Sequence, residues 1–434
     1  MPAENVYHVR GVAPDLFVKG PGEKWIDKYP HLDRGPVSYE SAVSPDFYEL
    51  EREAVFRRNW LYVGRAEWVG EAGKFFTKEI EVCKTSLIVV RGRDQKVRAF
   101  HNVCPHRGNK LVWDTHPATE VEGRCSRFYC KYHGLGFGLD GHVEHLTDAE
   151  TWYGEQGTSM KLAEVPCETW NGFIFVNLTP GGAKESLREF LGEYYWGGFD
   201  GYPFEQLTER YVAKGSVASN WKTLMDAFNE VYHGVFVHQQ SFPYLQQFKN
   251  DELQAMRNNL NALVGRHGFY ISPRNPQGLF VTDLERISVT SGTGPQYPFA
   301  IDLASKLPKA ANPLGTDDWG TSSHFIFPNT QIQFYYPGWY LTYQYWPLAH
   351  NRMRFEIDVH HLPSRNFSEL LSHYAHMSIF LDAALQDVNN LEATQRGLES
   401  GVFREWPLTD EEIIVRGFHR QVYDCVDAYR KAKG

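Results

Sequence analysis

The chain has few cysteines, no long apolar run and no run of basic residues. Six cysteines among 434 residues are too few for a disulfide framework, and Cys83, Cys125, Cys167 and Cys425 show no regular spacing. No stretch is long and apolar enough for a membrane span, and the first residues lack a cationic region followed by an apolar one. The formal net charge of -9 disfavours nucleic acid as a partner. We therefore expect a cytoplasmic protein that binds neither nucleic acid nor membrane.

The chain also lacks a glycine-rich nucleotide fingerprint after a predicted strand. If the protein depends on a dinucleotide cofactor such as NAD(P)H, we therefore expect that a separate protein binds this cofactor. A length of 434 residues exceeds one ordinary core, so two domains are expected. Aromatic residues make up 15% of the chain, which favours large cores or an aromatic-lined pocket.

Two short motifs carry the first functional signal. A C-x-H motif runs from Cys104 to His106, and a C-x-x-H motif runs from Cys130 to His133. Zinc fingers usually pair Cys with Cys and His with His, whereas here each motif supplies one thiol and one imidazole. Two such loops suit a 2Fe-2S cluster in which the Cys bind one iron and the His bind the other, the Rieske arrangement. A structural zinc site is the alternative.

The two motifs are separated by an insert of 23 residues, 107–129. A segment of this length between two ligand loops predicts a surface loop. Cys125 lies within it without a partner two residues away. We therefore expect that Cys125 is not a metal ligand.

The predicted elements divide the chain into an α+β arrangement. Residues 45–59 predict an amphipathic helix that begins at Ser44, and short strands follow up to about residue 180. Beyond residue 182, alternating strands between residues 323 and 362 precede a long helix that begins with the capping-box string Asn366 to Glu369. A curved antiparallel sheet followed by a long helix is a helix-grip arrangement.

These patterns predict a β-rich iron-sulfur domain at 60–180 and a helix-grip catalytic domain at 181–434. Residues 1–59 are predicted to be an N-terminal segment that packs with the catalytic domain. We find no internal repeat and no low-complexity segment.

A second group of candidate residues follows Asn220. On a helix, Asp226, Glu230, His233 and His238 fall within a limited arc, so all could face one interior site. The two His are about 140° apart on an ideal helix, too far for one metal ion. We therefore expect the helix to distort or to end near Gly234.

Two His and one carboxylate form the facial triad of non-haem iron(II) oxygenases, which leaves positions open for O2. Asp387 is the best candidate for the carboxylate, because it lies on the apolar stripe of the long helix. A buried acid is costly unless it is paired or metal-bound. A core Asp satisfied by a hydrogen bond is an equal alternative on this pattern alone.

Together these motifs resemble those of the Rieske non-haem iron oxygenase large (alpha) subunits, the aromatic-ring-hydroxylating oxygenase family. The resemblance runs from the helix before residue 60 to the C-terminal end of the chain. The strings that carry it are CPHRG at 104–108, C-x-Y-H-G at 130–134, N-W-K at 220–222, acid-x-x-H-x4-H at 230–238 and D-x4-E-x2-Q-x-G at 387–397.

The resemblance implies that His233, His238 and Asp387 hold a mononuclear Fe(II). It also implies that Glu230 is the acid that links the Rieske centre of one subunit to the iron of its neighbour. Glu230 stands where the ring dioxygenases commonly have Asp, and Asp226 stands where they usually have Glu. Both changes keep the acid but weaken an assignment to that subgroup.

The implied function is a terminal oxygenase component that uses O2 and electrons from NAD(P)H, delivered by a separate reductase with or without a ferredoxin. It would hydroxylate an apolar, ring-containing organic substrate by monohydroxylation, dihydroxylation or oxidative dealkylation. The implied assembly is a homotrimer, with or without a small β subunit. A non-catalytic Rieske electron carrier and a zinc-stabilised binding protein are the alternatives. Candidates for the pocket lining are Phe242, Tyr244, Leu245, Phe269, Phe280 and Phe325.

Overall fold

The computed structural model describes residues 19–20, 22–115, 119–238, 260–273, 307–313, 315, 319–335 and 339–434. The chain forms two compact units. The β-rich unit is Arg52–Phe190, and the helix-grip unit combines Met1–Glu51 with Leu191–Gly434. Within the described residues, no helix is long and apolar enough to cross a membrane.

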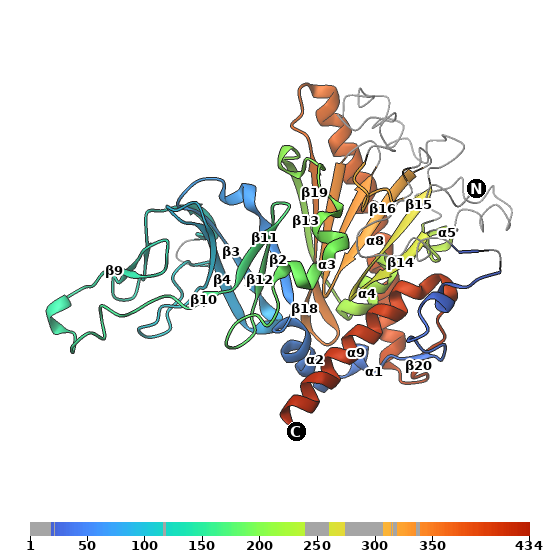
Figure 1. Cartoon of the computed structure of the whole chain (residues 1–434), viewed down its shortest axis with the longest axis horizontal. Helices are drawn as coiled ribbons and strands as arrows, with labels where there is room; N and C mark the ends of the chain where they lie inside the picture. The colour runs from blue at the N-terminus through green and yellow to red at the C-terminus, as the bar shows by residue number, and fades with distance from the viewer. Residues whose placement is uncertain are drawn as a thin grey trace. The chain divides into compact units, whose positions relative to one another are not determined.

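In its described residues, the β-rich unit contains three antiparallel sheets (Figure 1). Their strand orders are β10-β5-β4-β3-β6, β11-β12-β2 and β7-β8-β9. The strands are β2 (Trp60–Arg65), β3 (Lys74–Ile80), β4 (Thr85–Arg91), β5 (Val97–His101), β6 (Glu122–Arg124), β7 (Phe128–Tyr129), β8 (Gly136–Phe137), β9 (Val143–His145), β10 (Glu164–Val165), β11 (Cys167–Trp170) and β12 (Phe173–Asn177). The predicted helix at 45–59 forms as α2 (Pro45–Glu51) followed by a π-helical turn at Arg52–Phe56.

The helix-grip unit is built on a seven-stranded antiparallel sheet in the order β13-β19-β18-β17-β16-β15-β14 (Figure 1). The strands are β13 (Glu209–Val217), β14 (Leu260–Val264), β15 (His267–Pro273), β16 (Trp319–Ile326), β17 (Thr330–Tyr335), β18 (Trp339–Ala349) and β19 (Arg352–His361). The helices are α1 (Glu40–Val43), α3 (Leu187–Gly198), α4 (Trp221–Phe228), α5 (Gly234–Val237), α8 (Phe367–Glu399) and α9 (Ile413–Lys433). The predicted α+β fold is confirmed, because one chain contains both the β-rich unit and a unit built on this sheet and long helices.

Different elements cover the two faces of this sheet. Phe269 stacks on Tyr194 of α3, and Phe325 packs against Phe418 of α9, in both cases with ring centroids 5.2 Å apart. Successive residues of a strand point to opposite faces, so both faces can be covered at once. Strand β18 is buried along residues 339–347, the pattern of a strand that is packed on both sides.

Helix α8 begins as the capping-box string predicts. The Asn366 side-chain oxygen accepts a hydrogen bond from the backbone N–H of Glu369 at 3.0 Å. The helix then continues without interruption to Glu399. This long, regular element carries Asp387 to the face that packs on the sheet, where the side chain is buried.

Helix α4 is fixed to the N-terminal residues by a buried ion pair. Lys222 Nζ lies 2.6 Å from Glu51 Oε1, and both side chains are 0% exposed. Trp221 Nε1 donates to the other carboxylate oxygen of Glu51 at 3.1 Å, and Lys222 also donates to the carbonyl of Ser41 at 2.9 Å. Both charges are therefore compensated, as buried charges must be. A short β1 (Val37–Ser38) also pairs with β20 (Glu405–Trp406).

Candidate active site

The two Cys-His motifs form two loops with the same backbone closure. In the first loop, the N–H of Gly108 donates to the carbonyl of Cys104 at 3.0 Å. In the second loop, the N–H of Gly134 donates to the carbonyl of Cys130 at 2.8 Å. Both glycines have positive φ, 76° and 74°, a conformation that side chains other than glycine rarely adopt. The glycine at the end of each motif is therefore required by the turn that presents the ligands.

The loops bring thiol to thiol and imidazole to imidazole. Cys104 and Cys130 are neighbours in the core of the β-rich unit, each 1% exposed. The rings of His106 and His133 have centroids 4.8 Å apart. This separation of the two residue types suits a cluster in which one iron has sulfur ligands and the other has nitrogen ligands.

The electrostatics of the loops also fit a metal cluster. Burial, with the neighbouring Cys130 adding to it, raises the pKa of the Cys104 thiol to about 11. A metal would reverse this effect, because metals bind the thiolate. Among the residues that the structure describes, His106 Nδ1 is buried and has no hydrogen-bond partner. A buried nitrogen in this state is costly unless it binds a metal or another partner.

Aromatic side chains flank the imidazole pair. Trp152 packs against His106 with ring centroids 5.2 Å apart, and Tyr132 stacks on His133 at 3.8 Å. Arg107 lies over the Tyr132 ring at 5.2 Å. These contacts hold both imidazole rings in place without using their nitrogens.

Cys125 follows β6 and is only partly buried. Its backbone N–H donates to the carbonyl of Gly73 at 3.0 Å, beside β3. Burial raises the pKa of its thiol to about 11. The local structure of Cys125 is thus an edge of the sheet rather than a closed ligand loop.

The second candidate group lies at a break between two helices. Helix α4 ends at Phe228, and α5 begins at Gly234, so the helix ends earlier than the sequence predicts. The carboxylate of Glu230 accepts a hydrogen bond from the backbone N–H of His233 at 3.0 Å. Such a side-chain contact stabilises a turn in competition with a helix. The turn removes the angle of about 140° that a continuous helix would impose on the two His.

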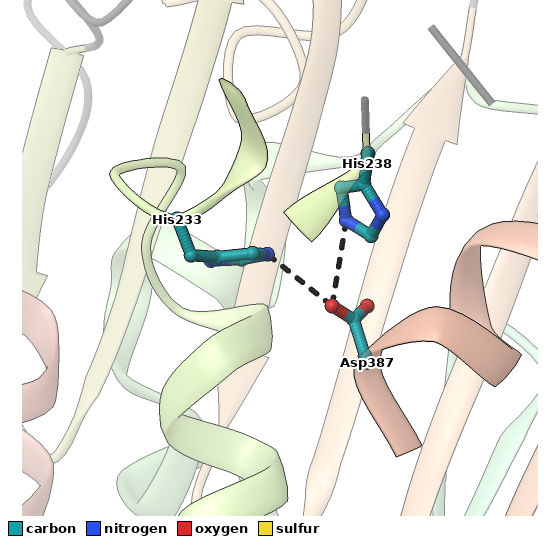
Figure 2. A group of neighbouring side chains, drawn as sticks. All are labelled: His233, His238 and Asp387. Atoms are coloured by element: carbon teal, nitrogen blue, oxygen red, sulfur yellow. Dashed lines mark ion pairs between the residues drawn. The ribbon is translucent and has the colours of Figure 1, made fainter. Parts of the chain in front are cut away.

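Figure 2 shows His233 and His238, at the two ends of α5, converging with Asp387 of α8. Asp387 Oδ1 lies 3.4 Å from Nε2 of His233 and 3.4 Å from Nε2 of His238. Their potential ligand atoms all lie within 4.8 Å of one another. Two imidazoles and one carboxylate at this separation could hold one metal ion and leave other coordination positions open.

The remaining ring nitrogens determine how the two imidazoles face the site. His233 Nδ1 lies 2.5 Å from Glu230 Oε1, and His238 Nδ1 lies 3.0 Å from Gln386 Oε1. Because these oxygens are acceptors, each Nδ1 carries a proton, and the Nε2 atom of each ring is the one that faces Asp387. A metal cation that displaced any proton from these nitrogens would find three ligand atoms around one point.

The acids around His233 favour a positive charge in the site. Burial disfavours a protonated His233, but hydrogen bonds with Asp387 and Glu230 outweigh burial and raise its pKa to about 10. The site therefore attracts positive charge. A metal ion supplies such charge and competes with the proton for Nε2.

Asp226 points to a different partner. Its two carboxylate oxygens lie 3.0 and 2.9 Å from His419 Nε2 on α9, so it is not part of the triad. No motif or periodic pattern in the sequence indicates a role for His419 or Gln386. Gln386 directly precedes Asp387, but only the fold shows that its side chain reaches His238.

Buried tyrosines lie on the sheet within electrostatic reach of the triad. Burial is the main cause that raises the pKa of Tyr270 to about 12, and the charges of Glu230 and Asp387 add to it. Burial also raises the pKa of Tyr343 and Tyr345 well above the usual value, with a contribution from Asp387. These side chains stay protonated and combine aromatic faces with hydroxyl groups.

The six residues predicted to line the pocket fall into two groups. Phe242, Tyr244, Leu245 and Phe280 lie outside the described residues. Phe269 packs on the α3 face of the sheet, and Phe325 packs against α9. Phe269 is therefore part of the core on the face opposite α9.

Two family profiles match the chain. The Rieske 2Fe-2S domain matches residues 59–166, and the ring hydroxylating alpha subunit (catalytic domain) matches residues 204–428. The first match spans the two Cys-His loops. The second spans the triad and covers more than half of the 434 residues.

Individual relatives share parts of this similarity. The chain is 29% identical over 223 residues to the carnitine monooxygenase oxygenase subunit of Escherichia coli (strain K12), which is 51% of this chain and 54% of that protein. It is 25% identical over 371 residues to the chloroplastic choline monooxygenase of Amaranthus tricolor, 83% of this chain and 70% of that protein. The match to the E. coli relative thus spans about half of its length.

The fold resembles that of naphthalene 1,2-dioxygenase from Rhodococcus sp., solved with indole bound. The TM-score is 0.69 at 18% identity, over 90% of this chain and 94% of that chain. Two closed Cys-His loops, a His-His-Asp triad and both profile matches lead to one assignment. The chain belongs to the Rieske non-haem iron oxygenase alpha subunits, a family with a Rieske 2Fe-2S cluster and a mononuclear iron.

Proposed function

We propose that this protein is the terminal oxygenase component of a Rieske oxygenase system that hydroxylates an organic substrate. The observation that carries the proposal is the convergence of His233, His238 and Asp387 in a chain that also has two Cys-His loops. An electron carrier alone would need only the loops. The triad is the feature that favours an oxygenase over a carrier or a zinc-stabilised binding protein.

The ligand sets are part of this proposal. Cys104, His106, Cys130 and His133 hold the 2Fe-2S cluster. His233, His238 and Asp387 hold Fe(II). The domain at residues 60–180 carries electrons, and the catalytic domain at 181–434 works together with the N-terminal segment. When bound, the two metal centres supply one-electron transfer and O2 activation.

The side chains of the chain orient these centres. Glu230 and Gln386 accept hydrogen bonds from the two imidazoles and so fix which nitrogen of each ring faces the metal. Asp387 neutralises part of the metal charge from a buried position on α8. A metal ion held by these three residues would keep coordination positions for O2.

Electrons reach the site from NAD(P)H through a separate reductase, with or without a ferredoxin. The active assembly is a homotrimer, with or without a small β subunit, and Glu230 links the iron to the cluster of the adjacent subunit. The contact between Glu230 and an iron ligand supports this role. A heterologous ring of three subunits provides the closed geometry that such a link needs.

Two substrate classes fit the aromatic surroundings of the triad. The first is an apolar, ring-containing compound. The second is a quaternary ammonium compound, because aromatic faces attract such cations and buried acids balance their charge. The hydroxyl-bearing rings of Tyr270, Tyr343 and Tyr345 near Asp387 favour the second class, as do the relatives that act on carnitine and choline.

The test is product analysis with labelled O2 on the purified, iron-loaded protein and a suitable reductase. The panel contains arenes, steroids, N- and O-alkyl compounds, and quaternary ammonium compounds. We expect label in a hydroxylated product or in the carbonyl fragment released by dealkylation. A colourless protein, or a cluster-containing protein that incorporates no label into any of these classes, would overturn the proposal.

A further inference from the structure

The insert between the two Cys-His loops makes polar contacts with the second loop. Lys131, which directly follows Cys130, donates to the carbonyl of Leu111 at 3.2 Å. Its ammonium forms an ion pair with Glu120 and lies 5.1 Å from the centroid of the Trp113 ring. Three groups of the insert thus hold one side chain of the second loop.

The start of the insert is itself firmly placed. The side-chain oxygen of Asn102 accepts hydrogen bonds from the N–H groups of Leu111 and Val112, at 3.0 and 2.9 Å. Both apolar side chains are buried in the same core as the two cysteines. The N–H of Glu120 donates to the carbonyl of Trp113 at 2.7 Å. The contacts to Lys131 therefore come from a fixed support.

Asn109, in the same insert, contacts both cysteines. Its carbonyl accepts a hydrogen bond from the backbone N–H of Cys104 at 2.8 Å. Its side-chain amide nitrogen lies 3.8 Å from the sulfur of Cys130 and donates to it. The same nitrogen donates to the carbonyl of Lys110 at 2.9 Å, which orients the amide. The half-buried Asn109 is thus an amide donor directed at a ligand sulfur.

We infer that the insert is a clamp on the second ligand loop, and that Asn109 is a positioning residue that raises the reduction potential of the cluster. A hydrogen bond to a cysteine sulfur stabilises the more negative, reduced state, so it makes reduction easier. The Lys131 cation acts in the same direction, and the Glu120 carboxylate acts against it. The inference depends on the proposed role of Cys130 as a ligand.

The decisive variant is Asn109→Leu, studied by a redox titration of the Rieske absorbance and of the electron paramagnetic resonance signal. Loss of the donor should make the cluster at least tenfold harder to reduce, a fall in midpoint potential of about 59 mV for one electron. Asn109→Gln keeps an amide donor and should recover part of the shift. Gln156→Leu, the same chemical change at an exposed residue of the same unit, should leave the potential unchanged.

Two charge-changing variants, which should shift the reduction potential in opposite directions, test the contact between the insert and Lys131. Glu120→Gln removes a negative charge and should raise the potential, whereas Lys131→Met should lower it. Both shifts should shrink at high salt, because this ion pair is partly exposed, while the Asn109→Leu shift should persist. Glu120→Gln should also speed loss of the cluster to a chelator, because it releases Lys131.

The outcomes separate this inference from the proposed function. If the unaltered protein shows no Rieske signal, the ligand assignment fails. If the signal is normal but Asn109→Leu leaves the potential unchanged, or Gln156→Leu shifts it equally, the role of Asn109 is wrong. If Asn109→Leu does not retain its cluster, a partial fall in the potential of Asn109→Gln together with a raised potential in Glu120→Gln supports the inference. The absence of both results overturns it.

Discussion

The cluster loops and the triad differ in what holds their ligands in place. In each loop, hydrogen bonds within the loop close the turn, and the four candidate ligands lie between residues 104 and 133. The triad joins a turn after α4 to a side chain on α8, so its members lie between residues 233 and 387. One site depends on local turns, and the other depends on the packing of a whole unit.

This difference implies separate vulnerabilities. A local loop keeps its geometry as long as its own hydrogen bonds and nearby core persist. A site assembled from distant elements loses its geometry when any of those elements shifts. Variants of the helix-grip unit should therefore damage the iron site while they spare the cluster.

The largest effect is expected for Asp387→Ala. It removes the carboxylate that faces both imidazoles, so the protein should lose its mononuclear iron and product formation, by at least a hundredfold. The Rieske absorbance should remain, because its ligands lie in the β-rich unit. Iron content and the visible spectrum of the same sample measure both. Asp424→Ala, an exposed acid on α9, serves as the control, and normal iron content in Asp387→Ala would show that Asp387 is only a hydrogen-bonded core acid.

The second largest effect is expected for Glu230, at the proposed link between the mononuclear iron and the 2Fe-2S cluster. Glu230→Gln keeps a side chain of the same shape but removes its charge. We expect both metals to stay bound and product formation to be nearly abolished, because the link to the cluster of the adjacent subunit is damaged. Single-turnover oxidation of the reduced cluster should slow to the same extent. Normal turnover, or an active species that sediments as a monomer, would contradict this role.

The contrast between local turns and long-range packing also explains how much of each site the sequence could predict. The loops were predictable because Cys104 to His106 and Cys130 to His133 are short motifs whose spacing limits the chemistry. For Asp387 the sequence supported only a buried acid on a helical stripe. Its approach to the His residues depends on how α8 packs against the sheet, a contact over more than 140 residues of chain.

The failed expectations have local physical causes. The helix after Asn220 was expected to distort or to end near Gly234, but it already ends at Phe228, because the contact between Glu230 and the backbone of His233 favours a turn. Asp226 shares a helical arc with Glu230 in the sequence, yet it pairs with His419 from α9. Long-range partners of this kind leave no periodic signal in a single sequence.

A smaller but measurable effect on stability is expected for the buried ion pair that connects α4 to Glu51. In Lys222→Met the carboxylate of Glu51 loses its buried cation, which should cost about 3–5 kcal/mol. We expect the helix-grip unit to unfold roughly 5–8 °C lower, and its iron to be lost earlier than the cluster. Calorimetry together with the visible spectrum measures this difference.

The controls for Lys222 separate charge from packing. Lys214→Met removes a lysine whose side chain is 53% exposed and should change the unfolding temperature little. The double variant Lys222→Met with Glu51→Gln should recover part of the loss, because no unpaired charge remains buried. Equal losses in the Lys222 and Lys214 variants would show that the buried pair has no special role.

The smallest effect is expected near the start of α8, where Glu209 meets His373 at 3.0 Å. Burial opposes ionisation of Glu209, but hydrogen bonds from His373, Tyr211 and Ser364 outweigh burial and lower its pKa to about 2. A lowered folded-state pKa stabilises the fold above the unfolded value near 4.5, and the contribution is lost as the pH falls toward 2. Glu209→Gln should therefore lose about 1 kcal/mol at neutral pH, with a difference from the unaltered protein that shrinks below pH 4.5. Urea unfolding at several pH values measures this, with the exposed Glu205→Gln as control, and a difference that does not change between pH 7 and pH 3 would rule out this ion pair as the cause.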